Sequence, residues 1–249
     1  MKIFYLLPGA DPQGRYVAHL RQILQSVAGE GTTVEVRDLP GAPTTLEYAF
    51  HQIYSAEPAI AEIHRAGETC DAVVMGCFMD PFMVEARQAC RVPVVGIGEA
   101  AMHVATVLGH KFSIVVGLPR LVAEADHLVT RLGLRERLAS IRPSALTITE
   151  MRAGSDEEPV VEAVVRKVIE EDGAEVVVAG CGSLGDHFRA LAPRMGVPLL
   201  DSRIMGLKVA ETLASLHRQG LATTSRVGLY APPPDVKRWV ERQSVIASR

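Results

Sequence analysis

The sequence has no long apolar run, no surplus of charge of one sign and few cysteines. Although 48% of its 249 residues are hydrophobic, no apolar run approaches the ~20 residues that a helix needs to cross a bilayer. The formal net charge of −3 offers no basis for binding nucleic acid or an anionic membrane. These features argue against a membrane protein and a nucleic-acid-binding protein, and the remaining composition is that of an ordinary globular chain.

The four cysteines, Cys70, Cys77, Cys90 and Cys181, are too unevenly spaced to suggest a disulfide framework in a chain of this length. Reduced thiols are typical of the cytoplasm, so we expect a cytoplasmic protein. The apolar segment at residues 2–7 is short and a charged, glycine-containing segment follows it at once. It therefore predicts a first strand and not a signal peptide.

Short apolar runs rich in β-branched residues alternate with segments of helical spacing along the whole chain. Strands are predicted at residues 2–7, 34–37, 72–75, 92–95, 111–116, 145–149, 176–179 and 197–200. Helices are predicted at residues 13–27, 45–65 with a break at Pro58, 81–90, 99–108, 121–132, 156–171, 184–195 and 205–217. This alternation predicts an α/β fold of parallel sheets with helices on both faces.

Two stretches of the chain echo one another. Residues 71–77 read Asp-Ala-Val-Val-Met-Gly-Cys and residues 174–181 read Ala-Glu-Val-Val-Val-Ala-Gly-Cys, so each predicted strand ends in Gly-Cys. The two cysteines are 104 residues apart, and the prolines of the next strands, Pro93 and Pro198, are 105 residues apart. A repeat of this length predicts two similar Rossmann-like lobes related by pseudo-twofold symmetry, with the active site between them. The expected lobes are residues 1–98 with 204–249, and residues 99–203.

Cys77 and Cys181 stand at the carboxyl ends of their predicted strands, the edge at which α/β sheets bind ligands. Each also precedes a predicted helix, whose N-terminus can lower the pKa of a thiol. Cysteine is more often a buried core residue, and that interpretation suffices for Cys70 and Cys90.

Two facing thiols can invert an acidic carbon. One thiolate removes the α-proton from one face, and the opposite thiol delivers a proton to the other face. Backbone N–H groups can hold the charge that develops on the substrate, and we expect these donors at Phe78, Met79, Gly182 and Ser183. This chemistry requires no metal and no cofactor.

Several segments carry a family resemblance. Residues 76–81 read Gly-Cys-Phe-Met-Asp-Pro, residues 93–102 read Pro-Val-Val-Gly-Ile-Gly-Glu-Ala-Ala-Met, and residues 108–115 read Leu-Gly-His-Lys-Phe-Ser-Ile-Val. These segments resemble the hydantoin (allantoin) racemase branch of the aspartate/glutamate/hydantoin racemase superfamily. Residues 180–181, 196–198 and 225–233 are similar to its second half and its tail.

The resemblance implies an isomerase that racemises or epimerises its substrate, with Cys77 and Cys181 as acid and base and without pyridoxal phosphate. A 5-substituted hydantoin or allantoin is the implied small-molecule substrate. The resemblance also implies a pocket between two α/β lobes, a final helix that returns to the first lobe, and a homo-oligomer.

Two loops depart from the pattern of this branch. Its members usually carry Asn-Pro-Asn after the first strand, where this chain has Leu-Pro-Gly-Ala at 7–10, and a Thr-Thr pair after the fifth strand, where this chain has Val-Gly-Leu-Pro at 116–119. Both loops are expected to line the pocket, so polar contacts with the substrate are lost or replaced there. The predicted substrate-binding residues are Pro8, Gly9, Gly76, Phe78, Met79, Glu99, Gly117, Leu118, Gly182 and Ser183.

Other polar residues have simpler explanations. Residues 96–101 fit a dinucleotide fingerprint, but the next strand carries no acidic residue at its end, so we expect a tight turn and no bound nucleotide. The histidines lack metal-ligand spacing, so no metal is expected. We expect Asp80 and Asp186 to cap helices, His187 to be exposed, and Arg203 and Lys208 to lie on solvated faces.

Two other functions are compatible with the same residues. An arylmalonate decarboxylase-like or maleate isomerase-like enzyme can use the same cysteines, and would release carbon dioxide or consume an alkene. A non-catalytic ligand-binding member of the fold can have lost the reaction together with the polar loop residues, and its cysteines would then alkylate slowly.

Overall fold

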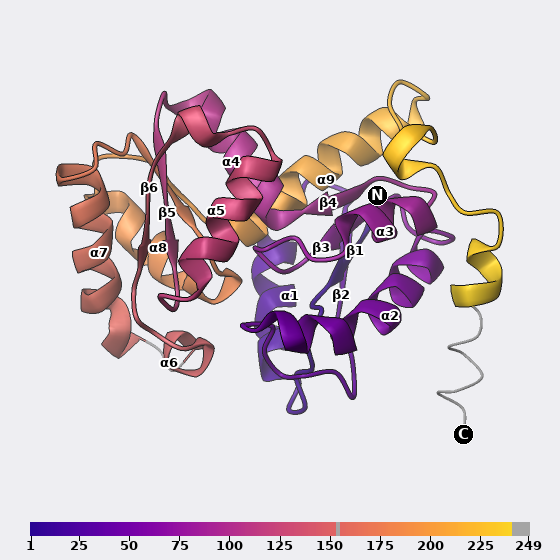
Figure 1. Ribbon diagram of the computed structural model, residues 1–249, viewed down its shortest axis with the longest axis horizontal. Helices are drawn as coiled ribbons and strands as arrows, with labels where there is room; N and C mark the ends of the chain where they lie inside the picture. The colour runs from indigo at the N-terminus through magenta and orange to yellow at the C-terminus, as the bar shows by residue number, and fades with distance from the viewer. Residues whose placement is uncertain (153–154, 241–249) are drawn as a thin grey trace. The chain divides into compact units, whose positions relative to one another are not determined.

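The computed structural model describes residues 1–152 and 155–240 (Figure 1). Residues 241–249, which we expected in the first lobe, lie outside the described residues. The chain divides into two compact units, the first made of Met1–Gly76, Pro81–Gly96 and Gly206–Arg249, and the second of Cys77–Asp80 and Ile97–Met205. The short segment that begins with Cys77 thus groups with the second unit, whereas the expected lobes put it in the first. No helix in the described ranges is long and apolar enough to cross a membrane.

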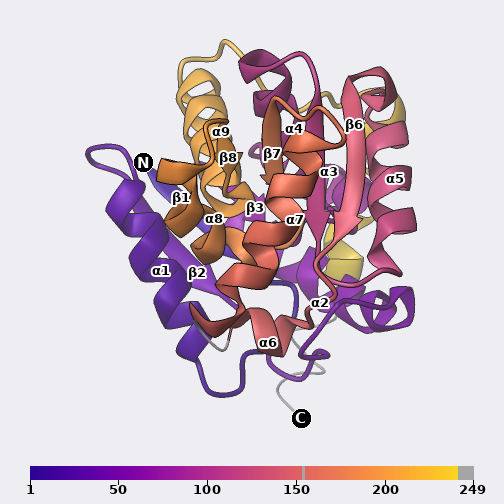
Figure 2. The same cartoon turned by 90° about the vertical axis from the view of Figure 1, so that its left-hand side faces the viewer.

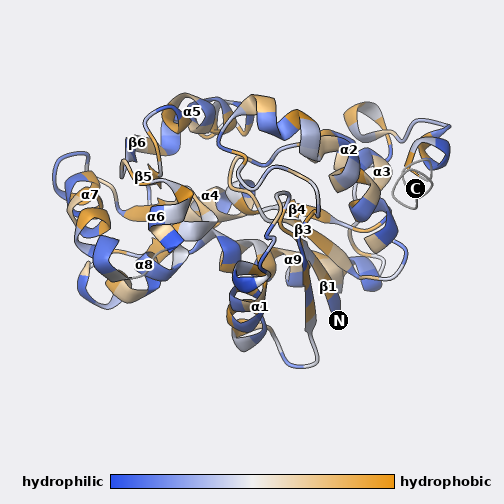
Figure 3. Cartoon of the chain, turned by 90° about the horizontal axis from the view of Figure 1, so that it is seen from below, coloured by the Kyte–Doolittle hydropathy of each residue, from blue (hydrophilic) through white to orange (hydrophobic). Residues whose placement is uncertain are grey.

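The first unit contains a four-stranded parallel sheet in the order β2-β1-β3-β4. Its strands are β1 (Lys2–Leu6), β2 (Thr33–Arg37), β3 (Ala72–Met75) and β4 (Val94–Gly96), and its helices include α1 (Arg15–Val27), α2 (Ala49–Ala66) and α3 (Met83–Ala89). Alternate strand residues such as Phe4 and Val73 share one buried cluster with Ile63 of α2 and Ala86 of α3. Helix α1 carries both hydrophilic and hydrophobic residues (Figure 3), and it buries Leu20, Ile23 and Leu24.

The second unit contains a four-stranded parallel sheet in the order β6-β5-β7-β8. Its strands are β5 (Phe112–Val116), β6 (Leu138–Pro143), β7 (Val176–Ala179) and β8 (Leu199–Leu200), and its helices are α4 (Ile97–Leu108), α5 (Leu121–Arg131), α6 (Ile148–Arg152), α7 (Glu158–Glu170) and α8 (Gly185–Leu191). Ile114 packs with α4 and α5, whereas its neighbour Val115 packs with α7 and α8. Helices therefore cover both faces of this sheet, as strand alternation requires, and Figure 2 shows α7 on the side that faces the viewer. Helix α9 (Ser202–Arg218) begins in this unit and belongs to the first unit from Gly206 onward.

The internal repeat is present in the topology and in individual hydrogen bonds. The order β2-β1-β3-β4 becomes β6-β5-β7-β8 when each strand is replaced by its counterpart. The N–H of Val73 donates to Pro93 O at 2.9 Å, and the N–H of Val177 donates to Pro198 O at the same distance. The predicted α/β fold with two similar parallel sheets is confirmed.

The glycine before each cysteine sits against the strand at the centre of its sheet. The N–H of Gly76 donates to Leu6 O at 2.8 Å, and the N–H of Gly180 donates to Val115 O at 2.8 Å. A Cβ on Gly76 would overlap the ring of Tyr5 and lie 2.7 Å from Leu6 O. A Cβ on Gly180 would lie 2.8 Å from Val115 O. Only glycine allows this close approach at either position.

One predicted strand is wrong. Residues 145–149 were expected as a strand, but the strand is β6, which ends at Pro143, and α6 begins at Ile148. The Glu150 carboxylate accepts hydrogen bonds from the N–H and hydroxyl of Thr147, and the N–H of Glu150 donates back to that hydroxyl. This is the reciprocal capping of a helix start by Thr-x-x-Glu, and it outweighs the strand preference of the flanking residues.

The predicted break at Pro58 is also wrong, because α2 continues through it. Proline lacks the N–H that would bond to the carbonyl of Tyr54, four residues earlier. Tyr54 lies on the exposed side of the helix, where water can satisfy that carbonyl. The cost of the proline is therefore limited to one replaced hydrogen bond.

We expect Gly76→Ala and Gly180→Ala to lower the free energy of unfolding by about 3 kcal/mol each, because the added methyl group overpacks a buried contact between two strands. The control is Gly31→Ala, where φ is +70° and nothing lies within 4 Å of the added Cβ. Its cost of about 1 kcal/mol comes from backbone conformation alone. Urea unfolding followed by circular dichroism measures the three values, and equal losses would show that the glycine contacts are not tight.

Candidate active site

Cys77 and Cys181 occupy matching positions, each directly after the glycine that follows the third strand of its sheet. Both are partly buried, while Cys70 and Cys90 are buried, and none of the four is in a disulfide. Both candidate catalytic cysteines belong to the second unit. Cys70 and Cys90 pack in the core of the first unit, as expected for structural cysteines.

The electrostatic surroundings of Cys77 are unfavourable to a thiolate. Burial raises its pKa from 9.0 to about 12, and the negative charges of Cys181, Asp80 and Glu124 act in the same direction. The backbone N–H of Met79 hydrogen-bonds to the sulfur and opposes the shift. The influence of Cys181 on this pKa shows that the two thiols are close enough to interact. Cys77 is therefore a thiol at neutral pH.

The expected lowering of the pKa by a helix N-terminus is wrong for Cys77. The next helix, α3, begins only at Met83, after Phe82 in a left-handed conformation with φ 59°. Five residues separate the thiol from that helix. The helix dipole falls off within one turn, so burial determines the pKa of Cys77.

Asp80 caps a different helix from the one expected. It was predicted to begin the helix that follows it, but its Oδ1 accepts the N–H of Gly98 at 3.0 Å and its Oδ2 accepts the N–H of Glu99 at 2.6 Å. These donors lie in the first turn of α4. Burial raises the pKa of Asp80, and the nearby Glu99 raises it further.

Gly98, the second glycine of the apparent dinucleotide fingerprint, has a packing role. A Cβ at this position would overlap the carbonyl oxygen of Phe78 and would lie 3.0 Å from Asp80 Oδ2. The glycine therefore lets the Cys77 loop approach the start of α4 closely.

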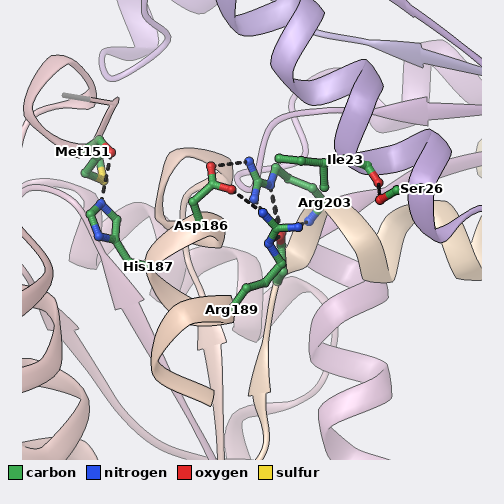
Figure 4. Close-up of polar contacts among 8 residues, drawn as sticks. Ile23, Ser26, Met151, Asp186, His187, Arg189 and Arg203 are labelled. Carbon is green, nitrogen blue, oxygen red and sulfur yellow. Dashed lines mark hydrogen bonds and ion pairs between the residues drawn. The ribbon is translucent and has the colours of Figure 1, made fainter. Parts of the chain in front are cut away.

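The Cys181 loop is held by α6. Cys181 precedes a short 3₁₀ turn, Gly182–Leu184, and then α8. The hydroxyl of Ser183 accepts a hydrogen bond from Arg152 Nε at 3.0 Å. His187 was expected to be exposed, but it is buried, and its Nε2 hydrogen-bonds to Met151 O at 3.1 Å (Figure 4). The exposed position predicted for His187 is therefore wrong, because α6 covers it.

Arg203 is fully buried, so the solvated face predicted for it is wrong. Its guanidinium binds Asp201 through Nε at 2.9 Å and Nη2 at 2.7 Å. Its Nη1 lies 3.2 Å from Asp186 Oδ2 (Figure 4). Asp186 also pairs with Arg189 and lies inside the first turn of α8, whose N-cap position is Leu184, so Asp186 is not at the cap position predicted for it. Lys208 is 43% exposed and pairs with Glu211, in line with a solvated position.

The predicted substrate-binding residues are divided between the units. Pro8, Gly9 and Gly76 belong to the first unit, and Phe78, Met79, Glu99, Gly117, Leu118, Gly182 and Ser183 belong to the second unit with both cysteines. In the first unit, Ala10 N–H donates to Pro43 O at 3.1 Å and closes the loop after β1. In the second unit, a Cβ on Gly117 would lie 2.9 Å from Leu146 O. Both glycine-containing loops are therefore packed on neighbouring backbone.

Two residues near the cysteines were not among the predicted site residues. Glu124 lies in the first turn of α5 and raises the pKa of Cys77, and Arg152 contacts Ser183 beside Cys181. Glu124 lies shortly after the loop that follows β5, which was predicted to line the pocket, so the sequence could have indicated that Glu124 lies near the site. Arg152 is the last residue of α6, a helix that was not predicted and that begins within the strand predicted at residues 145–149. Among the described residues, no group of three or more His, Cys, Asp or Glu side chains could hold a metal ion.

The sequence is similar to a family of known enzymes. The profile described as Asp/Glu/Hydantoin racemase matches residues 15–210. The hydantoin racemase of Paenarthrobacter aurescens is 32% identical over 216 residues, which are 85% of this chain and 89% of that protein.

Two solved structures extend the similarity to the fold. The allantoin racemase from Klebsiella pneumoniae is 30% identical, with a TM-score of 0.84 over 94% of both chains. The allantoin racemase from Pseudomonas fluorescens is 29% identical, with a TM-score of 0.83 over 94% of this chain and 97% of that one. With the two parallel sheets and the family profile, these likenesses lead to one conclusion: the chain belongs to the Asp/Glu/Hydantoin racemase family and is, at that level, a racemase, which is an isomerase.

Proposed function

We propose that this racemase inverts a 5-substituted hydantoin or allantoin, and that Cys77 and Cys181 exchange the protons. The observation that carries the proposal is the interaction between the two thiols, each of which follows the third strand of its sheet: a negative charge on Cys181 raises the pKa of Cys77. The substrate class is taken from the similar proteins, which are named hydantoin racemase and allantoin racemase. In these cyclic ureides the hydrogen to be removed lies on a carbon beside a carbonyl group.

The coupled pair holds one proton when it is ready to react. Burial, and to a smaller extent a negative charge on Cys181, raises the pKa of Cys77, so we propose that Cys77 keeps its proton while Cys181 loses one. With the proton on Cys77, Cys181 is the base for the substrate enantiomer whose C–H bond points at it. Cys77 then delivers its proton to the opposite face, and the two cysteines have exchanged roles.

The charge on the substrate after proton removal is spread over an enolate. We propose that the N–H groups of Phe78, Gly182 and Ser183 face the enolate oxygen, since preorganised donors stabilise such charge. The N–H of Met79 has another role, because it hydrogen-bonds to Cys77 and stabilises the thiolate that forms there. Every group in this scheme belongs to the chain itself, so we propose a reaction that needs no cofactor.

Replacing either cysteine by alanine is expected to slow racemisation by about 10²–10⁴-fold, the contribution typical of a positioned acid or base. The measurement is polarimetry and proton NMR in deuterated water, with both enantiomers of 5-benzylhydantoin and of allantoin. Cys70→Ala, the same change at a core cysteine, is the control and should keep most of the activity. Full activity of Cys77→Ala would contradict the two-cysteine reaction.

The pH dependence of cysteine alkylation tests the electrostatic coupling. With a pKa of about 12, the rate at Cys77 is expected to rise steadily between pH 8 and 10, without the plateau of a thiol near its ordinary value of about 8.5. Cys181→Ser and Glu124→Gln each remove a negative charge, so each lowers the pKa of Cys77 and raises its rate at pH 9. Peptide-resolved mass spectrometry after iodoacetamide treatment measures this rate. Glu170→Gln removes an exposed charge at the end of α7 and is the control; the same acceleration there would refute a local effect.

A further inference from the structure

We propose that Asp80 and Asp186 are positioning residues, each of which holds one of the two cysteines for proton transfer at one face of the substrate. The inference deepens the proposed two-cysteine reaction and rests on it. Asp80 lies three residues after Cys77, and Asp186 lies five residues after Cys181. Each carboxylate joins its cysteine loop to the helix that follows the fourth strand of a sheet.

Asp80 makes its connection through the backbone of α4. Both carboxylate oxygens are used, on the N–H groups of Gly98 and Glu99, and the side chain is fully buried. The N–H of Asp80 donates to Cys77 O at 3.1 Å, which closes the turn that carries the thiol. Movement of the carboxylate would therefore move the cysteine.

The backbone of this loop is strained in a way that requires such an anchor. Asp80 has φ 48° and Phe82 has φ 59°, in the left-handed region that residues other than glycine adopt infrequently. Such conformations are unfavourable and persist only where surrounding contacts enforce them. The two hydrogen bonds of the Asp80 carboxylate and the contact of Phe78 O with Gly98 supply these contacts.

Asp186 makes its connection through a side chain of α9. Its Oδ2 accepts from Nη1 of Arg203, whose Nε and Nη2 are bound to Asp201. Gly185 leaves the room for this arrangement, because a Cβ there would overlap the guanidinium and lie 2.5 Å from Asp201. The buried guanidinium thus connects the Cys181 loop with the start of α9, and Figure 4 shows Asp186 and Arg203 facing one another.

The two connections occupy equivalent places in the repeat but use different chemistry. Helices α4 and α9 each begin after the fourth strand of a sheet. One connection is a carboxylate on backbone N–H groups, and the other is a carboxylate on a guanidinium. Because they share no residue, a change in one is expected to leave the other intact.

Steady-state racemisation alone cannot show whether a variant has displaced Cys77 or Cys181. The equilibrium constant between enantiomers is 1, so any variant has the same kcat/KM in both directions. Exchange of the α-hydrogen with deuterated water is informative, because one cysteine can remove a proton and return a deuteron on its own face. Such exchange with retention reports on one cysteine at a time.

The test compares Asp80→Asn and Asp186→Asn with Cys77→Ser and Cys181→Ser. In Asp80→Asn the amide NH₂ faces a backbone N–H and loses one hydrogen bond, and a shift of about 1 Å at Cys77 is expected to slow racemisation by up to about 10²-fold. Exchange with retention is expected to survive for the same enantiomer as in Cys77→Ser. Asp186→Asn is expected to retain exchange for the opposite enantiomer, as in Cys181→Ser. Loss of exchange with retention for both enantiomers alike in an aspartate variant would overturn the proposal. Normal racemisation in either aspartate variant would also overturn it.

The matched control is Asp126→Asn, because Asp126 is also 38% exposed and also pairs with an arginine, Arg135. It is expected to leave racemisation and exchange unchanged. Asp80→Ser, which keeps one short acceptor, and Arg203→Lys, which keeps the charge, provide second variants where an asparagine variant fails to fold. Asp80→Ser is expected to retain exchange for the same enantiomer as Asp80→Asn, and Arg203→Lys for the same enantiomer as Asp186→Asn. Retention for the opposite enantiomer in either variant would count against the proposal.

Peptide-resolved alkylation of the folded variants distinguishes failure of this inference from failure of the proposed function. A change at Asp80 is expected to alter the alkylation rate of Cys77 severalfold more than that of Cys181, and a change at Asp186 the reverse. This measurement needs no substrate. If the cysteine variants racemise normally while the alkylation rates change as expected, the two-cysteine reaction is wrong but the positioning roles of Asp80 and Asp186 stand. If a change at either aspartate alters the alkylation rates of both cysteines equally, the positioning roles are wrong.

Discussion

The contact between a glycine and the central strand of each sheet is the constraint on which the site depends. Gly76 and Gly180 bring their backbone within hydrogen-bonding distance of Leu6 and Val115, and neither place has room for a Cβ. The next residue on each strand is therefore delivered to the carboxyl edge of its sheet at a defined point. That residue is a cysteine in both cases, so a simple packing rule applied twice positions both thiols.

Burial and like charge then determine what the thiols can do. A reactive cysteine is commonly activated by a lowered pKa, but Cys77 lies where burial and the charges of Cys181, Asp80 and Glu124 favour the thiol. A proton donor needs this state, and a racemase needs one donor and one acceptor at a time. In the proposed two-cysteine reaction, the burial and like charge that disfavour ionisation of Cys77 also prepare it as the acid.

The two halves of the repeat share topology but not local electrostatics. The Cys77 loop is followed by a buried carboxyl group whose partners are backbone N–H groups, whereas the Cys181 loop is followed by a cluster of carboxylates and arginines around Arg203. A repeat conserves what packing demands, such as glycines and strand order. The polar groups around each cysteine differ because each can be satisfied in more than one way.

The sequence by itself determined the α/β fold, the repeat and the positions of the two cysteines, because strands and helices have distinct periods and Gly-Cys recurs at the end of matching strands. Local signals were also present where prediction failed, as in the Thr147 to Glu150 cap of α6. Only the tertiary structure decided the partners of Asp80, the burial of His187 and Arg203, and the raised pKa of Cys77. These properties depend on groups distant in the chain: Asp80 bonds to residues 18 and 19 positions away, and desolvation is a property of everything that surrounds a group.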